Sequence, residues 1–234
     1  MTTDLNRLPV TQRMQLQIDR WHAAGDRRAT FLACYQLMTN NMLSAIDAGE
    51  FNDAEWVYSL LHHFAEYYFD ALDAYEQDRA DTPHIWRQAH DAARQPGTLV
   101  IQNLLLGINA HINFDLIFAM VDMLEDDWAQ LSPDERQGRY DDHCHVNDII
   151  RSSIDAVQDT VIEPDEPLMD VIDKLFGPAD EWVVSRLITQ WRDHVWGQVQ
   201  ILLDISDSSQ RQQQRERIEA EALKRAARML HLSL

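Results

Sequence analysis

Apolar residues recur every three or four positions along most of the chain, a spacing that places them on one face of a helix. Glycine and proline, which end helices, each occur only 7 times in 234 residues, so long helices with few turns are expected. The pattern predicts helices over residues 10–24, 27–48, 56–78, 83–94, 99–127, 140–161, 168–176, 180–205 and 210–231.

The strongest departure from this pattern lies inside an apolar run from residue 99 to residue 124. There Asn109, His111, Asn113 and Asp115 place a polar side chain at every second position. Such alternation is typical of a strand, but the run is too long for one, and no second strand pattern exists for it to pair with. On a helix, Asn109 and Asn113 share one face, and His111 and Asp115 share a nearly opposite one. A helix that is polar on two sides yet apolar overall is expected to be surrounded by partner helices.

Several residues predict where helices begin, bend or end. Residues 52–55 and 132–135 both have the form of a capping box, in which two side chains satisfy free N–H groups at a helix start. Thr82-Pro83 is a helix start with proline in the first turn. Gly107 is where the long central helix is expected to break, and its missing side chain would let a neighbouring helix come close.

Together these elements predict an all-α fold, a single-domain multi-helix bundle around one buried central helix. The bundle is expected to cover residues 1–205, and residues 206–234 to form a C-terminal amphipathic helix. Residues 163–167, which carry two prolines, are the only linker-like segment. The last helix has a narrow apolar stripe that is expected to dock on the bundle or on a partner, and the stripe consists of Ile218, Ala222, Ala226 and Met229.

The charge balance narrows the classes of partner. The chain holds 39 acidic and 20 basic residues, a formal net charge of −19, so neither a nucleic acid nor an anionic membrane surface is an expected partner. No secretory signal and no run of about 18 uncharged apolar residues is found, which predicts a cytoplasmic protein without membrane insertion. Cys34 and Cys144 are too few for a disulfide scaffold. The seven tryptophans and the amphipathic tail would suit a homodimer.

Three helices carry a histidine four residues before an acid or an amide, the spacing that puts two ligands on one helix face. Imidazole and carboxylate groups on facing helices can hold Zn, Mn or Fe, and an open position on such a metal activates water. This hypothesis describes a metal-dependent, hydrolase-like enzyme acting on a small-molecule substrate, with a phosphoester as one candidate. The pairs are His62/Glu66, His111/Asp115 and His143/Asn147. The expected divalent metal ligands are His111 and Asp115, with His62, Glu66 and His143 as further ligands.

Arg28 and Tyr35 could complete such a site. Arg28 lies near a helix start, where a guanidinium can bind a substrate anion, and Tyr35 lies on the same helix. With His111 and Asp115 they are the expected catalytic residues. The alternative for Arg28 is an ion pair with one of the many carboxylates of this chain.

A non-enzymatic function is the alternative for the whole chain. An aspartate four residues after a histidine is also a common hydrogen-bonded pair in a buried network, which would serve to fix the register of the helices. The tryptophan-rich helices and the C-terminal stripe would then form the surface of a binding or assembly protein. Four other histidines are expected at the surface, namely His22, His84, His90 and His231.

The box Leu106-Gly107-x-Asn109-Ala110-His111-Ile112-Asn113-x-Asp115-Leu116 resembles the signature of an uncharacterised bacterial family, a domain of unknown function. The resemblance spans residues 20–205 and implies a helical domain of bacterial origin without an established activity. Further segments that fit the family pattern are residues 25–35, 64–72, 83–86 and 191–196, together with Asp148.

One element also resembles the zinc-dependent phospholipase C and P1-type nuclease group. The all-helical members of that group use His-x-x-x-Asp pairs on core helices, which His111 and Asp115 match. The N-terminal tryptophan ligand and the other histidine spacings of the group are absent from this sequence. This is a likeness at the level of the fold.

Overall fold

The computed structural model describes residues 8–157 and 180–231, and this part of the chain is all-α, as predicted. The predicted linker at 163–167 and the short helix at 168–176 lie outside the described residues, as does the predicted helix end at residue 161. The elements in order are α1 (Val10–Ala24), α2 (Ala29–Asp47), α3 (Ala54–Glu76), α4 (His84–Arg94), α5 (Val100–Ala110), η2 (His111–Asp115), α6 (Leu116–Leu124), α7 (Pro133–Val157), α9 (Asp180–Asp204) and α10 (Ser208–Leu230).

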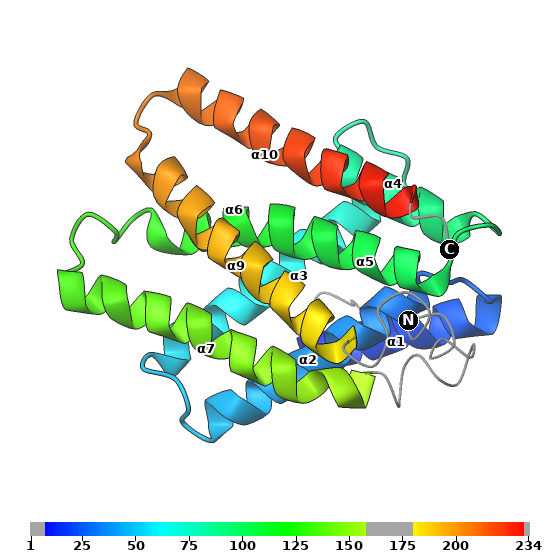
Figure 1. The fold of residues 1–234 in the computed structure, drawn as a ribbon, viewed down its shortest axis with the longest axis horizontal. Helices are drawn as coiled ribbons and strands as arrows, with labels where there is room; N and C mark the ends of the chain where they lie inside the picture. Colours follow the sequence, from blue (N-terminus) through cyan, green and yellow to red (C-terminus); the bar gives the residue numbers. More distant parts are fainter. Residues whose placement is uncertain (1–7, 158–179, 232–234) are drawn as a thin grey trace.

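The predicted central helix is continuous from residue 100 to residue 124 and runs through the middle of the fold (Figure 1). It consists of α5, one π-helical turn (η2) and α6. The predicted break at Gly107 is wrong, because the irregularity begins at His111, whose carbonyl accepts from the N–H of Leu116 in the i→i+5 pattern of a π-helix. Gly107 serves close packing instead, since a Cβ built on it would lie 2.5 Å from ring carbons of Phe31 on α2.

The apolar core lies on both sides of the π-helical turn. One cluster joins α5 mainly to α1, α2, α3, α4 and α10, and a second joins α6 mainly to α7, α9 and the first turn of α3. Ile112 and Phe114, on the turn itself, pack against both clusters. The polar residues of the central helix therefore lie where the two halves of the core meet.

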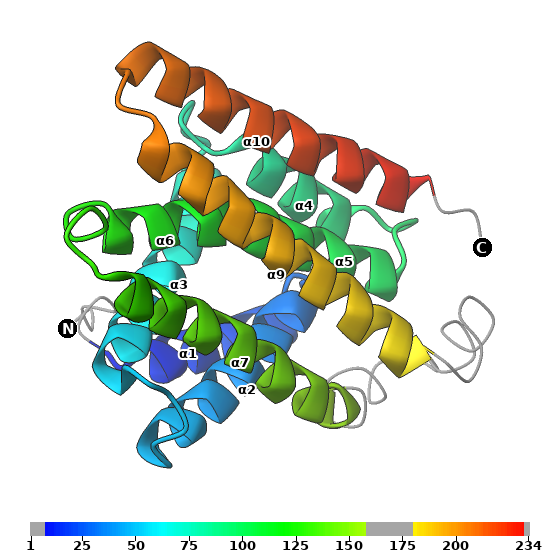
Figure 2. The same ribbon diagram turned by 60° about the vertical axis from the view of Figure 1, so that its left-hand side comes forward.

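The other helices surround the central one on several sides. α7 and α9 cross one side and lie against each other, with α9 packed on α6 (Figures 1 and 2). α1 pairs with α2, and α10 lies along α4 and α5. Helices from both ends of the chain thus enclose the central helix, as its polar and apolar pattern predicted.

Two helix starts differ from the predicted ones. Ser132 and Glu135 form the predicted capping box, but the helix continues from Pro133 without a gap before residue 140. The predicted box at residues 52–55 does not form as such. Asp53 alone caps α3, because its carboxylate accepts from the N–H of Trp56 at 2.9 Å.

The last helix docks on the bundle through the predicted stripe, all four residues of which are buried. Two amide side chains of the central helix also reach the backbone of α10. Asn109 donates to the carbonyl of Ala222 at 3.0 Å, and Gln102 donates to the carbonyl of Met229 at 3.1 Å. These bonds satisfy two buried amides and fix α10 along α5.

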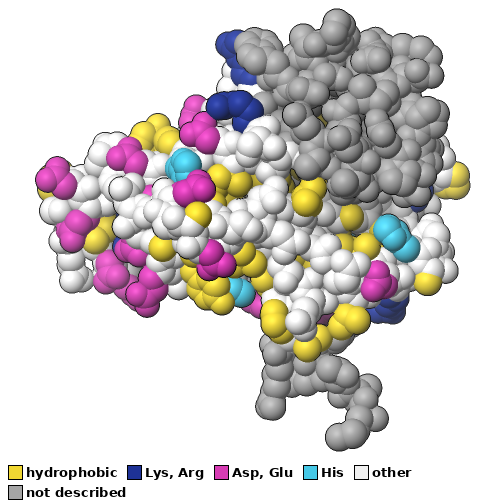
Figure 3. All heavy atoms as spheres, turned by 90° about the horizontal axis from the view of Figure 1, so that it is seen from below, with side chains coloured by type: hydrophobic (Ala, Val, Ile, Leu, Met, Phe, Trp, Pro, Cys, Tyr) yellow, Lys and Arg dark blue, Asp and Glu magenta, His cyan; other side chains and the backbone are white. Residues whose placement is uncertain are grey.

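The stretch Val100–Leu124 is long and apolar enough, by length and composition alone, to cross a membrane. In this fold 83% of its most apolar window is buried inside the protein, and core helices of soluble proteins pass the same test. The described part of the surface in Figure 3 shows more acidic than basic side chains, in line with the net charge of −19.

Candidate functional site

The centre of the candidate site is a hydrogen-bonded group from the π-helical turn and α4. His111 Nδ1 lies 3.1 Å from Asp115 Oδ2, and we refer to these two residues as the dyad. Trp86 donates its indole N–H to both oxygens of Asp115, at 3.0 and 2.9 Å. The side chains of His111 and Asp115 are only 5% and 1% exposed, so the predicted pair forms and is removed from solvent.

Burial controls the protonation of the dyad. It raises the pKa of Asp115 well above its ordinary value, although the hydrogen bond from Trp86 opposes this, and it lowers the pKa of His111 well below its ordinary value. Both pKa shifts disfavour the charged form of the side chain concerned, so the dyad as a whole is favoured without net charge. In its uncharged form the dyad shares one proton between Oδ2 and Nδ1 and carries a second hydrogen on His111 Nε2.

Five aromatic rings enclose the imidazole of His111, and we call them the aromatic chamber. Phe64 stacks on the imidazole, with ring centroids 3.6 Å apart and planes 9° apart, and Tyr35 meets it at 4.2 Å. The other three centroids lie 5.9 to 6.2 Å away. The chamber consists of Phe31 and Tyr35 from α2, Phe64 and Tyr68 from α3, and Trp86 from α4.

Three buried polar atoms of this group have no hydrogen-bond partner within the described part of the protein, namely His111 Nε2 and the hydroxyls of Tyr35 and Tyr68. Their rings are mutual neighbours, with centroid separations of 4.2, 6.0 and 6.1 Å. A buried polar group without a hydrogen bond costs about 1–3 kcal/mol, so a cluster of three calls for an explanation. These atoms are the groups through which the chamber could bind a ligand.

One side of the chamber lies close to the surface. Tyr35 and Phe64 are partly exposed, whereas Phe31, Tyr68 and Trp86 are buried. Both partly exposed rings contact the imidazole directly, so a single layer of side chains covers it there.

Helical spacing explains how the sequence builds the chamber. Phe31 and Tyr35, like Phe64 and Tyr68, lie four residues apart and so project from one face of their helix. The missing side chain of Gly107 allows the ring of Phe31 to lie against α5. The π-helical turn occurs where the dyad is held, and such turns are frequent at functional sites.

The structure brings together three of the four predicted catalytic residues, because Tyr35 contacts the dyad. Arg28 lies elsewhere, at the start of α2. Its guanidinium pairs with Asp26 at 2.6 Å and with Glu76 at 3.4 Å, which is the alternative expected for it. Burial raises the pKa of Asp26, but the hydrogen bonds from Arg28 outweigh this and lower it.

The further metal ligands that the sequence predicted do not gather around the dyad. Glu66 is half exposed and pairs with Arg13 at 3.0 Å. His62 packs its ring against Tyr58, with centroids 4.4 Å apart. Within residues 8–157 and 180–231, no three His, Cys, Asp or Glu side chains form a group that could hold a metal ion. The chamber therefore supplies only two of the five expected ligands.

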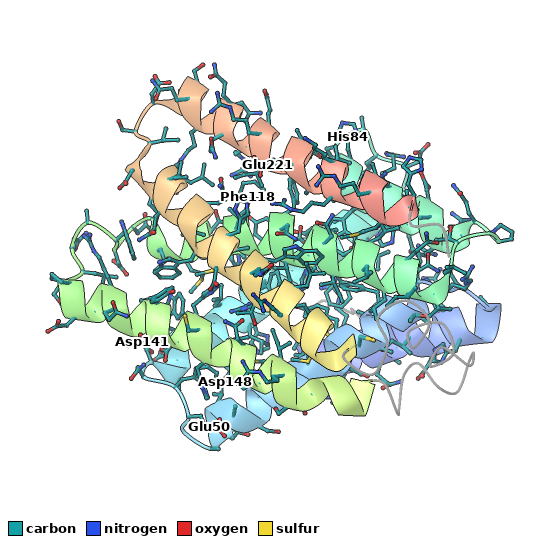
Figure 4. The ribbon with its side chains drawn as sticks, viewed as in Figure 1. Glu50, His84, Phe118, Asp141, Asp148 and Glu221 are labelled. Carbon is teal, nitrogen blue, oxygen red and sulfur yellow. The ribbon has the colours of Figure 1, made fainter. Side chains whose placement is uncertain are left out.

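His143 belongs to a separate buried contact between α7 and α9. Its Nε2 donates to the carbonyl of Arg192 at 2.9 Å, and the Arg192 guanidinium donates to the His143 carbonyl at 2.8 Å and to Nδ1 at 3.2 Å. The nearby His145 instead contacts the half-exposed carboxylate of Glu50 at 3.1 Å, and Figure 4 labels Glu50 near α7. His143 thus joins two helices and is not part of the dyad's surroundings.

His90 is buried, so the prediction that it lies at the surface is wrong, while His22, His84 and His231 are exposed as predicted. The ring of His90 lies between those of Trp86 and Tyr75, at centroid distances of 5.3 and 4.7 Å. Sequence reasoning missed both Trp86 and His90 as parts of the site. A signal was present, because both fall on the apolar face of α4 with the buried positions 85, 89 and 93.

Replacement of His90 by phenylalanine is expected to reduce the acid sensitivity of the fold. Burial, with the nearby charge of Arg28, lowers the pKa of His90 from 6.5 to about 3, so below pH 6.5 the unfolded chain takes up a proton that the folded protein does not. Stability is therefore lost as the pH falls from 6.5 toward 3, by up to about 1.4 kcal/mol per pH unit. Urea unfolding at several pH values between 7 and 4 measures this slope. Equal slopes for His90→Phe and the parent protein would contradict the prediction.

Comparison with known proteins places this arrangement in a family. The model of a family described as a family of unknown function (DUF5995) matches residues 9–232, a range that contains every helix described above. No curated protein and no solved structure gives a match to the chain.

Proposed function

The chain belongs to the DUF5995 family, a family of unknown function, and we propose that it is a hydrolase-like general acid–base enzyme. In this proposal the dyad exchanges a proton with a small, uncharged substrate bound in the aromatic chamber. One observation carries the proposal. His111 is bonded to Asp115 through Nδ1, while its buried Nε2 has no partner among the described residues.

Asp115 gives His111 the orientation that proton transfer requires. An aspartate bonded to Nδ1 fixes the ring and leaves Nε2 as the atom that gives or takes a proton. Trp86 holds Asp115 in turn, because its indole N–H bonds both carboxyl oxygens. The proton-transfer group is therefore supported on two helices.

The hydrolysis of an ester illustrates the step. His111 Nε2 takes a proton from water while the water oxygen bonds to the carbonyl carbon. The proton then passes to the leaving oxygen as its bond to the carbonyl carbon breaks, so the dyad ends as it began. The step uses the form of the dyad that has lost one proton overall, in which Nδ1 keeps its hydrogen and donates it to the Asp115 carboxylate while Nε2 is bare. The rate is therefore expected to rise with pH through the raised pKa of Asp115.

The composition of the chamber favours an uncharged ester over a phosphoester. The groups against His111 are aromatic rings and one carboxyl group, which suit an apolar or aromatic body. Burial raises the pKa of the Tyr35 and Tyr68 hydroxyls, so both keep their protons and can donate to a carbonyl oxygen. We assign His111 to proton transfer because its Nε2 is buried beside two hydroxyl groups and has no partner among the described residues.

A structural dyad in a non-enzymatic binding or assembly protein is the second candidate. The bond from Trp86 ties α4 to the central helix, which favours this alternative. On the opposite face, Asn113 donates to Asn109 at 3.2 Å and Asn109 donates to α10, a purely positional arrangement. Asn113 Oδ1 also has no partner among the described residues, but only His111 Nε2 has as ring neighbours two tyrosines whose hydroxyls are unpartnered as well.

Hydrolysis of p-nitrophenyl acetate, butyrate and phosphate by the purified protein tests the proposal. The parent protein is expected to turn over an acyl ester, and His111→Gln is expected to lower kcat by about 10²–10⁴-fold. His63→Gln is the matched control, because His63 lies on α3 and pairs with Asp122 at the surface, at 3.0 Å. It is expected to keep the parent kcat. Circular dichroism and a thermal scan establish that each variant is folded.

Two results would overturn the proposal that this protein is an acid–base enzyme. Equal kcat values for the parent protein and a folded His111→Gln variant would show that the dyad does not transfer the proton. No turnover of any of the three probes above the rate in buffer would favour the structural alternative.

A further inference from the structure

We propose that a second site, outside the aromatic chamber, binds a small organic anion that carries a phosphate or carboxylate group. The site is a cavity of about 440 Å³ at the meeting of α1, α2, α3 and α4. That volume is in the range of sites for small molecules. Four arginines and Tyr75 line it, and we call it the arginine pocket. The arginines are Arg20, Arg28, Arg87 and Arg94.

The pocket gathers arginines in a protein that is acidic as a whole. Its lining has four arginines and the three carboxylates of Glu76, Asp78 and Asp91, and Asp26 pairs with Arg28 beside it, so basic and acidic groups balance here in a chain of net charge −19. Guanidinium groups are suited to anions, because their planar N–H donors match the oxygens of phosphate and carboxylate. An anion bound here would meet guanidinium donors and would not meet the excess of acidic groups that the rest of the chain carries.

Two of the arginines are held in place by other residues and form a fixed wall. Arg28 bonds Asp26 and Glu76, and its guanidinium lies 4.6 Å from the ring centroid of Trp21. Arg87 bonds Asp78 at 2.9 Å and the backbone carbonyl of Arg79 at 2.9 Å. The side-chain entropy of both is lost on folding and so does not oppose ligand binding.

The other two arginines use few of their N–H donors in contacts within the protein. Arg20 is 69% exposed, and its contact with Glu76 is a long one, at 3.8 Å. Arg94 is exposed and has Tyr75 as its hydrogen-bonding neighbour. Each guanidinium has several N–H donors, and these contacts use a minority of them. The carboxylates already have partners, because Asp91 accepts from Tyr75 at 2.7 Å and Asp78 from Arg87. Arg20 and Arg94 are therefore the expected anion ligands.

A series of side-chain contacts connects the arginine pocket to the candidate site. Tyr75 lines the pocket and contacts His90, His90 stacks on Trp86, and Trp86 bonds Asp115 of the dyad. His90 Nε2 is buried and has no partner among the described residues, so this series of contacts includes an unused polar atom. A ligand that moves Tyr75 would thus act on the residues that support the dyad.

Isothermal titration of the full chain with inorganic phosphate and, separately, with succinate tests the proposal at low ionic strength. The parent protein is expected to bind at least one probe with a Kd of about 1 mM or tighter. The double variant Arg20→Gln/Arg94→Gln is expected to bind it at least about tenfold more weakly. The preferred probe distinguishes a phosphate ligand from a carboxylate one. Both replaced side chains are solvent-exposed, so the double variant is expected to fold.

Arg217→Gln is the matched control, because Arg217 is an exposed arginine of α10 that does not line the pocket. It is expected to bind the probe like the parent protein. Absence of saturable heat with either probe up to about 20 mM, or equal affinity in the parent protein and the double variant, would overturn the proposal. The measurement involves no turnover, so its failure would leave the proposed acid–base chemistry of the dyad untouched.

Discussion

Replacing Asp115 by alanine is expected to lower the free energy of unfolding by about 3–5 kcal/mol, a large share of the stability of an ordinary domain. The carboxyl group accepts the indole N–H of Trp86 and bonds His111 Nδ1, and all three side chains are buried. The alanine variant leaves both partners without a hydrogen bond and leaves a cavity as well. Urea unfolding followed by circular dichroism measures the change in free energy.

Asp148→Ala provides the comparison for this measurement. Asp148 is 61% exposed and pairs with Arg151 at the surface of α7, so its removal is expected to change stability by at most about 0.5 kcal/mol. Asp115→Asn keeps the shape and one acceptor oxygen and should fall between the two variants. A loss below about 1 kcal/mol for Asp115→Ala would mean that the bonds to Trp86 and His111 do not hold the fold.

Replacing Gly107 by alanine is expected to destabilise the protein by about 1–3 kcal/mol, although alanine is the better helix former by about 1 kcal/mol. The added Cβ would lie 2.5 Å from Cγ and Cδ2 of Phe31 and 3.0 Å from its Cβ. Phe31 is buried among the rings of the chamber, so the whole side chain must shift to relieve the clash. Overpacking of this kind strains a close-packed core.

The control for this variant is Gly138→Ala on α7. A Cβ at Gly138 would meet no atom within 4 Å, so only the gain in helix propensity is expected, an increase of about 0.5–1 kcal/mol. Thermal unfolding of both variants compares a packed and an open helical glycine directly. Stabilisation by Gly107→Ala similar to that of Gly138→Ala would show that α2 does not press on the central helix at this point.

Local patterns in the sequence predicted much of the fold. The bounds of α1, the end of α4 and the start of α9 follow from glycine, proline and apolar spacing, and the match over residues 9–232 confirms the resemblance to a family of unknown function. The two opposite polar faces of the central helix also follow from the sequence. Asn109 reaches α10, while His111 lies among rings from α2 and α3.

Contacts between distant segments could not be predicted in this way. Trp86 bonds Asp115 across 29 positions, and nothing in the local pattern of α4 selects that partner. The π-helical turn was missed because its extra residue depends on packing from several helices and leaves no mark on apolar spacing. The arginine pocket was missed because its lining comes from four helices, and each arginine alone resembles an ordinary surface residue.

The bonds between the central helix and α10 have a consequence for the order in which the chain can fold. Asn109 and Gln102 find their acceptors at Ala222 and Met229, more than a hundred positions later. During synthesis the central helix leaves the ribosome well before those acceptors exist, since domains emerge N-terminal end first. Until α10 arrives, these two amides and the face of α4 and α5 that it covers must stay hydrated. The centre of the protein is therefore completed only when α10, the last of the described helices, has been made.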